Sequence, residues 1–252
     1  MSRLVVLACA AVMATMLGAA EEDTATRWHR TLVENQRRVQ AAEWEAAYPV
    51  ARDLVGELVA ALKGGEAGRQ LLAAAYCQRA LAEAGLGRTE DAVWSFVIAQ
   101  NLNPDFRVTP LAAFGAAGEA LEGHRLPDSH GGVLDLERLE LVPPLVVESP
   151  TIVFRAAPEI LASFDRTMTV EVVVGPEGRP RDPIVRGVLD NPSPVALSLE
   201  ALRAWRFEPA HLEGRAVACR VTLALPLTRG AAERARRDLT VLHAERTASD
   251  VP

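Results

Sequence analysis

The feature that most constrains the fold is a junction between a helix and a strand in residues 201–210. The first four residues favour a helix, and Pro209 cannot continue one. Between them lie Trp205 and Phe207, in a chain whose aromatic content is only 5 %. As strand residues two apart, both rings would point to the same face. We expect them to hold the helix against a sheet, or alternatively to shape a groove for a partner.

A predicted strand follows this junction. Gly214 predicts a turn, and beyond it apolar and polar residues alternate over residues 217–225. The residues expected along the partner-binding edge of this strand are Val217, Cys219, Val221 and Leu223. Because the last strand of a sheet has one open edge, its main chain can pair with a strand from another protein. We expect Pro226 to end that pairing.

The residues before the junction predict the rest of a small domain. Alternation over residues 168–174 indicates a half-buried strand, and a glycine turn precedes a return strand beginning at Ile184. Ser193 can cap the next helix, and Pro194 suits its first position. The order strand, strand, helix, strand predicts one antiparallel sheet with one helix packed on a face.

This pattern resembles the C-terminal domain of the TonB family, over residues 151–228, about a third of the chain. The family runs from an Ala-rich helix into a Trp-Arg-Phe-x-Pro-Ala signature and a glycine turn. The matching residues here are Trp205, Phe207, Pro209 and Gly214. Residues 162–167 depart from the family, which usually has a glycine there. The resemblance implies a domain that binds the N-terminal box of an outer-membrane TonB-dependent transporter by strand addition.

Residues 21–123 are helical in character, since apolar positions recur three and four residues apart. Helices are expected near residues 25–41, 43–62, 68–85, 89–102 and 109–122. One hairpin resembles a tetratricopeptide repeat through Gly87, Ala92, Phe96, Ala99, Leu102 and Pro104. Arg79 and Glu83 depart from that repeat, and a plain helical bundle is the alternative. The predicted fold class is α+β, with a helical tetratricopeptide-like domain and a β-β-α-β TonB-like domain.

The remaining segments predict how the chain is exported and connected. Residues 1–20 resemble a cleaved signal peptide and imply a periplasmic protein; an uncleaved inner-membrane anchor is the alternative. Residues 124–150 form a Pro/Gly linker, and residues 229–252 form a charged tail. Cleavage would leave Cys77 and Cys219, either as a disulfide or as two buried thiols.

The sequence contains no recognisable catalytic motif, so we expect neither an enzyme nor a bound cofactor. His124, Asp128 and His130 could bind a metal ion, although a solvated loop without metal is the favoured interpretation. A net charge of −6 with scattered basic residues argues against a nucleic-acid partner.

Two functions remain open from sequence. The first is an exported TonB-like envelope protein that binds a transporter segment by strand addition, in energy transduction for transport. The alternative is a periplasmic scaffold that carries helical-repeat and TonB-like modules without transducing energy. The linker at residues 124–150 is much shorter than the spacer typical of TonB.

Overall fold

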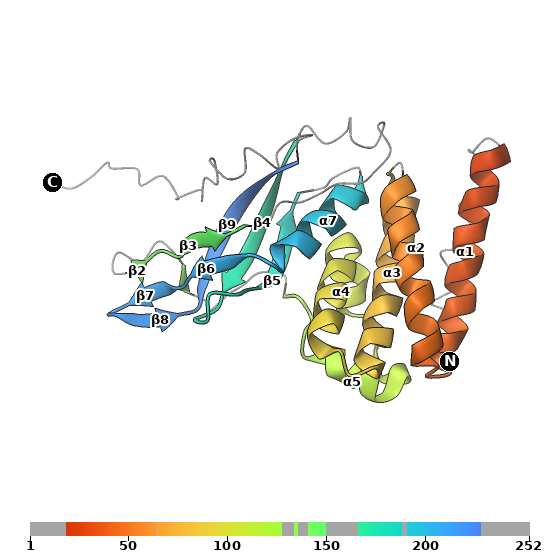
Figure 1. Ribbon diagram of the computed structural model, residues 1–252, viewed down its shortest axis with the longest axis horizontal. Helices are drawn as coiled ribbons and strands as arrows, with labels where there is room; N and C mark the ends of the chain where they lie inside the picture. The colour runs from red at the N-terminus through yellow and green to blue at the C-terminus, as the bar shows by residue number, and fades with distance from the viewer. Residues whose placement is uncertain are drawn as a thin grey trace. The chain divides into compact units, whose positions relative to one another are not determined.

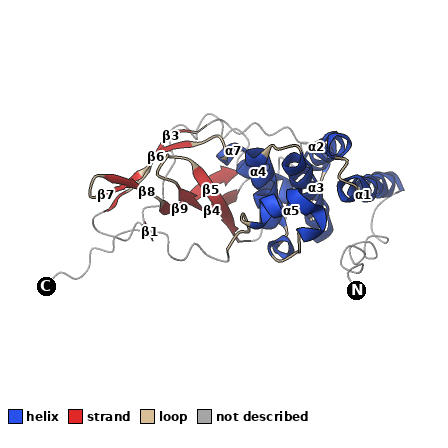
Figure 2. Cartoon of the chain, turned by 90° about the horizontal axis from the view of Figure 1, so that it is seen from below, coloured by secondary structure: helices blue, strands red, loops and turns tan. Residues whose placement is uncertain are grey.

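The computed structural model describes residues 19–62, 64–127, 134–135, 141–149, 166–187 and 191–227. The chain divides into two compact units, one up to Arg125 and one from Leu126 onward. The described part of the first unit is helical, and that of the second contains the strands and one helix (Figure 2). The α+β class is therefore confirmed. Most of the predicted signal peptide, part of the predicted linker and all of the predicted tail lie outside the described residues.

The helices of the first unit follow the predicted ranges (Figure 1). They are α1 (Ala19–Gln40), α2 (Trp44–Ala61), α3 (Glu66–Gly85), α4 (Thr89–Leu102) and α5 (Gly115–Glu122), with 3-10 turns η1 (Pro104–Arg107) and η2 (Ala112–Phe114) before α5. The helix expected at residues 109–122 is shorter than predicted, because η2 takes its first part. None of the described helices has both the length and the apolar character that crossing a membrane would require.

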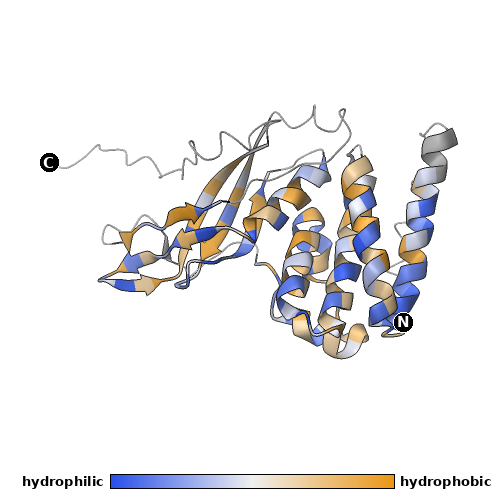
Figure 3. Ribbon diagram, in the orientation of Figure 1, coloured by the Kyte–Doolittle hydropathy of each residue, from blue (hydrophilic) through white to orange (hydrophobic). Residues whose placement is uncertain are grey.

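Helix α3 is at the centre of the first unit, because it contacts α1, α2, α4 and α5. Tyr76 and Leu72 of α3 are fully buried. The small residues Ala92 and Ala99 and the ring of Phe96 are also fully buried on α4, which shares its largest helix contact with α3. Helix α1 is mainly hydrophilic (Figure 3), although its Trp28 and Val39 reach the core.

The second unit is built on an antiparallel group of three strands. These are β4 (Arg166–Val174), β5 (Pro180–Arg186) and β9 (Cys219–Leu227), with β4 in the middle. The inward face carries the apolar residues that alternation predicted, among them Val170 and Val172, both fully buried. Helix α7 (Pro192–Leu202) packs against the sheet at β5 (Figure 1).

The prediction of a single antiparallel sheet is wrong in two respects. A fourth strand, β1 (Leu134–Asp135), joins the main sheet parallel to β9, giving the order β1-β9-β4-β5. Further short strands form the sheets β2-β7-β8 and β3-β6. They are β2 (Leu141–Val142), β3 (Leu145–Glu148), β6 (Arg206–Glu208), β7 (Ala210–Leu212) and β8 (Arg215–Val217). Strands of two to four residues are too short to show an alternation in sequence.

Two predicted boundaries in this unit are also corrected. Asn191, not Ser193, caps α7: its side-chain oxygen accepts a hydrogen bond from the Ser193 N–H at 3.0 Å. Asn caps as well as Ser does, and Pro192 suits the first turn as well as Pro194 does, so the pattern fits two registers. The return strand begins at Pro180, ahead of the predicted Ile184.

Candidate partner-binding strand edge

The two aromatic residues of the junction are core residues. Trp205 and Phe207 are 3 % and 6 % exposed, with ring centroids 6.1 Å apart. Trp205 lies just before β6, so only Phe207 is a strand residue, which corrects the expectation that both are. The Phe207 N–H donates a hydrogen bond to the carbonyl of Gly178 at 2.9 Å. The junction is thereby joined to the β4–β5 turn, and its burial favours packing over a partner groove.

The glycines of the two turns have the same backbone conformation in different surroundings. Gly178 and Gly214 both have a φ of +75°, where an L side chain is strained. A Cβ on Gly178 would lie 2.0 Å from the carbonyl oxygen of Phe207, whereas a Cβ on Gly214 would meet no atom within 4 Å. Pro209 is half-buried between β6 and β7. Gly178 therefore allows the close approach that the junction needs.

The four residues predicted for the strand edge do not share one strand. Val217 ends β8 and pairs with Ala210, because the strand expected over residues 217–225 is interrupted at Ala218. Cys219, Val221 and Leu223 lie together on β9 and are at most 2 % exposed. Their side chains face the core, so a partner approaching this edge would meet the main chain of β9 and not those side chains.

The position of Pro226 indicates which main-chain groups face outward. Pro226 pairs in register with Thr167 of β4, so pairing on the inner edge continues through it, and the prediction that Pro226 ends pairing concerns only the outer edge. Proline has no N–H, and it therefore suits a position whose nitrogen faces away from the neighbouring strand. The main-chain N–H and C=O groups of successive strand residues point alternately to the two sides of the strand. Arg220, Thr222 and Ala224 then direct their N–H and C=O groups toward the outer edge of β9.

The outer edge of β9 is occupied over only part of its length by described strands. Strand β1 pairs with Cys219 and Arg220. From Val221 to Leu225, no other described strand pairs with this edge. We call this stretch, residues 221–225 on the outer side of β9, the open edge.

The opposite edge of the sheet is unsuited to pairing. Strand β5 contains Pro180 and Pro183, each without an N–H, and Asp182 has a φ of +50°. Its register with β4 also shifts between Glu171 and Val173. Prolines and irregular backbone are the devices by which proteins prevent edge pairing. On the other side of β4, β9 has a regular backbone register over its whole length, and β1 pairs with only two of its residues.

A row of charges crosses the outward face of the main sheet. Glu171 of β4 accepts from Arg186 of β5 at 2.8 Å, and Arg220 of β9 lies 4.0 Å from its other carboxylate oxygen. The position beside Arg220 is already taken by Asp135 of β1, which lies opposite it in register. Charges of opposite sign on adjacent strands stabilise pairing by about 0.2–1 kcal/mol.

Glu83 of the helical unit is a buried acid. It is 3 % exposed, and its carboxylate accepts a hydrogen bond from the Ser95 hydroxyl at 2.5 Å. Arg79 donates to the same hydroxyl at 2.9 Å and lies over the ring of Tyr76. Burial raises the pKa of Glu83, and this exceeds the lowering by Ser95 and Arg79. The cluster joins α3 to α4 and explains why Arg79 and Glu83 stand where a repeat would be apolar.

The raised pKa of Glu83 leads to a pH-dependent prediction. The folded protein holds this proton more tightly than the unfolded chain, so its contribution to stability is present at low pH and is lost as the pH rises through the raised pKa. Arg79, Arg88, Ser95 and Asp91 are the groups that act on it. We expect the Glu83→Gln variant to gain stability relative to wild type between pH 4 and pH 8. Urea unfolding at both pH values measures this; a constant difference would contradict it.

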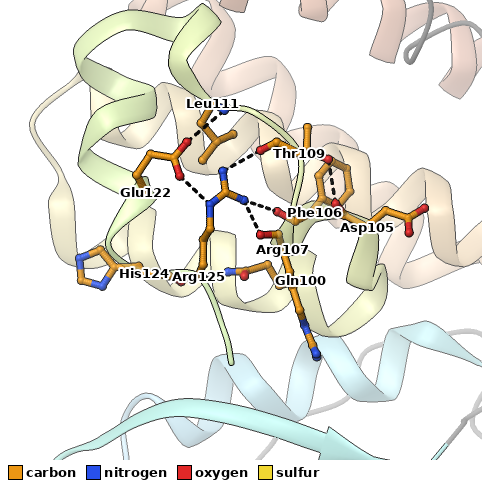
Figure 4. Close-up of polar contacts among 9 residues, drawn as sticks. All are labelled: Gln100, Asp105, Phe106, Arg107, Thr109, Leu111, Glu122, His124 and Arg125. Atoms are coloured by element: carbon orange, nitrogen blue, oxygen red, sulfur yellow. Dashed lines mark hydrogen bonds and ion pairs between the residues drawn. The ribbon is translucent and has the colours of Figure 1, made fainter. Parts of the chain in front are cut away.

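Arg125 forms hydrogen bonds with the segment between α4 and α5 (Figure 4). Its guanidinium donates to the carbonyls of Phe106, Arg107 and Thr109 at 2.7–3.0 Å, and to the carboxylate of Glu122 at 2.5 Å. The hydrogen bond from Arg125 lowers the pKa of Glu122, and its other oxygen accepts from the main-chain N–H of Leu111, which also lowers that pKa. This cluster satisfies loop carbonyls and has no group free for catalysis.

The predicted metal ligands are only partly described. The main-chain carbonyl of His124 accepts from Gln100 at 3.1 Å, and its ring points away from the Arg125 cluster (Figure 4). Asp128 and His130 lie outside the described residues. Within the described ranges, no group of three His, Cys, Asp or Glu side chains could hold a metal ion.

Both described cysteines are buried thiols outside any disulfide, so the second of the two alternatives is the one found. Burial raises the pKa of Cys77 to about 12. A thiol with so high a pKa has almost no thiolate near neutral pH, and thiolate is the reactive form. Cys77 is therefore a packing residue.

The sequence allowed a short element within residues 133–141 but did not predict that β1 pairs with the first two positions of the edge. Its two residues carry no periodic signal, and parallel pairing with β9 depends on tertiary structure alone.

Comparison with known proteins adds no assignment to this site: no family model, no curated protein and no solved structure matches the chain.

Proposed function

We propose that the second unit is a TonB-like domain that binds an extended protein segment along the open edge of β9. The partner class is an outer-membrane TonB-dependent transporter, and the chain acts in the periplasm in energy transduction for transport. Main-chain hydrogen bonds from Thr222 and Ala224 provide the affinity. No catalytic residue and no cofactor is required.

The observation that carries this proposal is the contrast between the two edges of the sheet. The β9 edge has regular backbone and no described pairing strand from Val221 to Leu225, whereas Pro180 and Pro183 interrupt β5. Trp205 and Phe207 are buried and fix the start of the segment that leads into β9. A rigid, pre-formed edge loses little entropy on binding.

The helical unit adds a second protein contact in this proposal. Its α3–α4 hairpin buries Ala92, Phe96 and Ala99, the residues that suggest a tetratricopeptide-like unit. Small residues let such helices approach closely, and repeats of this kind present surfaces for protein partners. The alternative is that the first unit is a plain helical bundle with no partner-binding surface of its own.

The second candidate is a periplasmic scaffold without energy transduction. It is favoured by the signal-peptide-like residues 1–20 and by residues 124–150, which are much shorter than a TonB spacer and contain β1, β2 and β3 of the second unit. N-terminal sequencing of the exported protein separates the two. Removal of residues 1–20 leaves no inner-membrane anchor for coupling to a motor and favours the scaffold, whereas an intact N-terminus favours transduction.

The binding site itself is tested with the Ala224→Pro variant. Proline removes one outward N–H and leaves the β4 side of the strand unchanged. We expect affinity for a synthetic peptide carrying a transporter N-terminal box to fall at least about tenfold, the effect of about 1.4 kcal/mol. Isothermal titration measures it.

The matched control is Ala224→Val, which keeps the N–H and adds a side chain of similar size. It should bind as the wild type does, and both variants should have wild-type circular dichroism. Equal binding by Ala224→Pro and Ala224→Val would exclude the open edge as the site.

A further inference from the structure

Strand β1 lies in the same row as the open edge. Leu134 and Asp135 pair with Cys219 and Arg220 in register and parallel to β9. Because β1 runs in the direction of β9, its end at Asp135 points toward the position beside Val221. A segment that enters the open edge therefore meets the end of β1.

The stretch of β9 with which no described strand pairs on the outer side is short. Asp135 limits it at one end, and at the other Pro226 offers no outward N–H. Five residues of β9 lie between these limits, Val221 to Leu225. A typical strand has five to six residues, so a guest strand of six or more residues reaches the positions that β1 holds.

Strand β1 is also easy to displace. It has two residues, and parallel pairs are slightly less stable per residue than antiparallel ones. In register, Asp135 lies opposite Arg220, and one such pair of opposite charges adds no more than about 1 kcal/mol to the pairing. β1 is therefore paired only weakly with β9.

We infer that β1 is a resident strand that regulates the site: the chain pairs with its own docking edge, and a guest strand binds by displacing Leu134–Asp135. This inference rests on the proposed function of the open edge. A guest strand then competes with β1. The apparent affinity of the guest is its intrinsic affinity multiplied by the fraction of molecules in which β1 is released.

The test uses a labelled synthetic peptide that copies residues 131–140 of this chain, so that no natural partner need be known. The full chain is compared with Leu134→Pro, which removes an N–H from β1, and with Leu134→Ala, which keeps it. We expect the peptide to bind Leu134→Pro about tenfold more tightly than wild type. Leu134→Ala should bind as wild type does. Fluorescence anisotropy measures all three.

Amide hydrogen exchange at Arg220 provides an independent readout. In Leu134→Pro the outward N–H of Arg220 loses its neighbour, so its exchange should accelerate relative to wild type and Leu134→Ala. Equal peptide affinity in wild type and Leu134→Pro would overturn the inference while leaving the open edge as a binding site. Faster exchange at Arg220 with no peptide binding to either protein would overturn the competition, whereas the proposed function is tested separately by the transporter-box peptide and Ala224→Pro.

Discussion

Replacing Trp205 with alanine is expected to lower the free energy of unfolding of the second unit by about 3–5 kcal/mol. The indole is 3 % exposed and packs beside Phe207, so truncation leaves a large cavity where the helix meets the sheet. Urea unfolding followed by circular dichroism measures the change. A variant that keeps wild-type stability but no longer binds a transporter peptide would show that the ring lines a partner groove.

The control for this substitution is Trp205→Phe. The indole N–H is buried and has no hydrogen-bond partner, so its removal sacrifices no bond. Phenylalanine keeps most of the apolar contact, and we expect a loss well below that of alanine, since substitutions that conserve volume cost less than about 1.5 kcal/mol. Equal losses for the two variants would mean that the indole nitrogen, and not the ring, is essential.

Gly178→Ala is expected to destabilise the same unit by more than about 2 kcal/mol. The left-handed backbone alone costs an L residue roughly 1–2 kcal/mol. The new Cβ would also lie 2.0 Å from the carbonyl oxygen of Phe207, which forces the β4–β5 turn away from the junction. The hydrogen bond from Phe207 to Gly178 would then be lost as well.

Gly214→Ala is a matched control for Gly178→Ala. Gly214 has the same φ of +75°, but its added Cβ meets no atom within 4 Å. It should therefore cost only the backbone term of about 1–2 kcal/mol. The difference between the two free energies of unfolding isolates the close contact with Phe207; equal costs would show that this contact does not matter.

The long elements could be predicted from sequence because each carries a repeated physical signal. Apolar residues three and four apart located α2, α3 and α4, and strict alternation located β4 and most of β9. Proline and glycine marked the junction, because their backbone limits act locally. The burial of Trp205 followed from the scarcity of aromatic residues in a chain that must bury a core.

The details of the site could not be predicted in this way. The pairing of β1 with Cys219 depends on contacts 85 positions apart, for which a two-residue strand gives no local sign. The interruption at Ala218 was also missed, because alternation continues through it and separates Val217 from β9 only in the structure. Asn191 and Ser193 were equivalent caps in sequence, and tertiary packing selected the first.

The central claim, that β9 accepts a guest strand on its outer edge, is tested most directly by amide hydrogen exchange measured by NMR on the full chain. The N–H groups of Thr222 and Ala224 face this edge, whereas that of Leu223 faces β4. On addition of a transporter-box peptide, we expect exchange at Thr222 and Ala224 to slow at least tenfold, about the effect of one moderate hydrogen bond. Leu223 should be protected with or without peptide. Bound peptide with unchanged exchange at Thr222 and Ala224 would contradict this account.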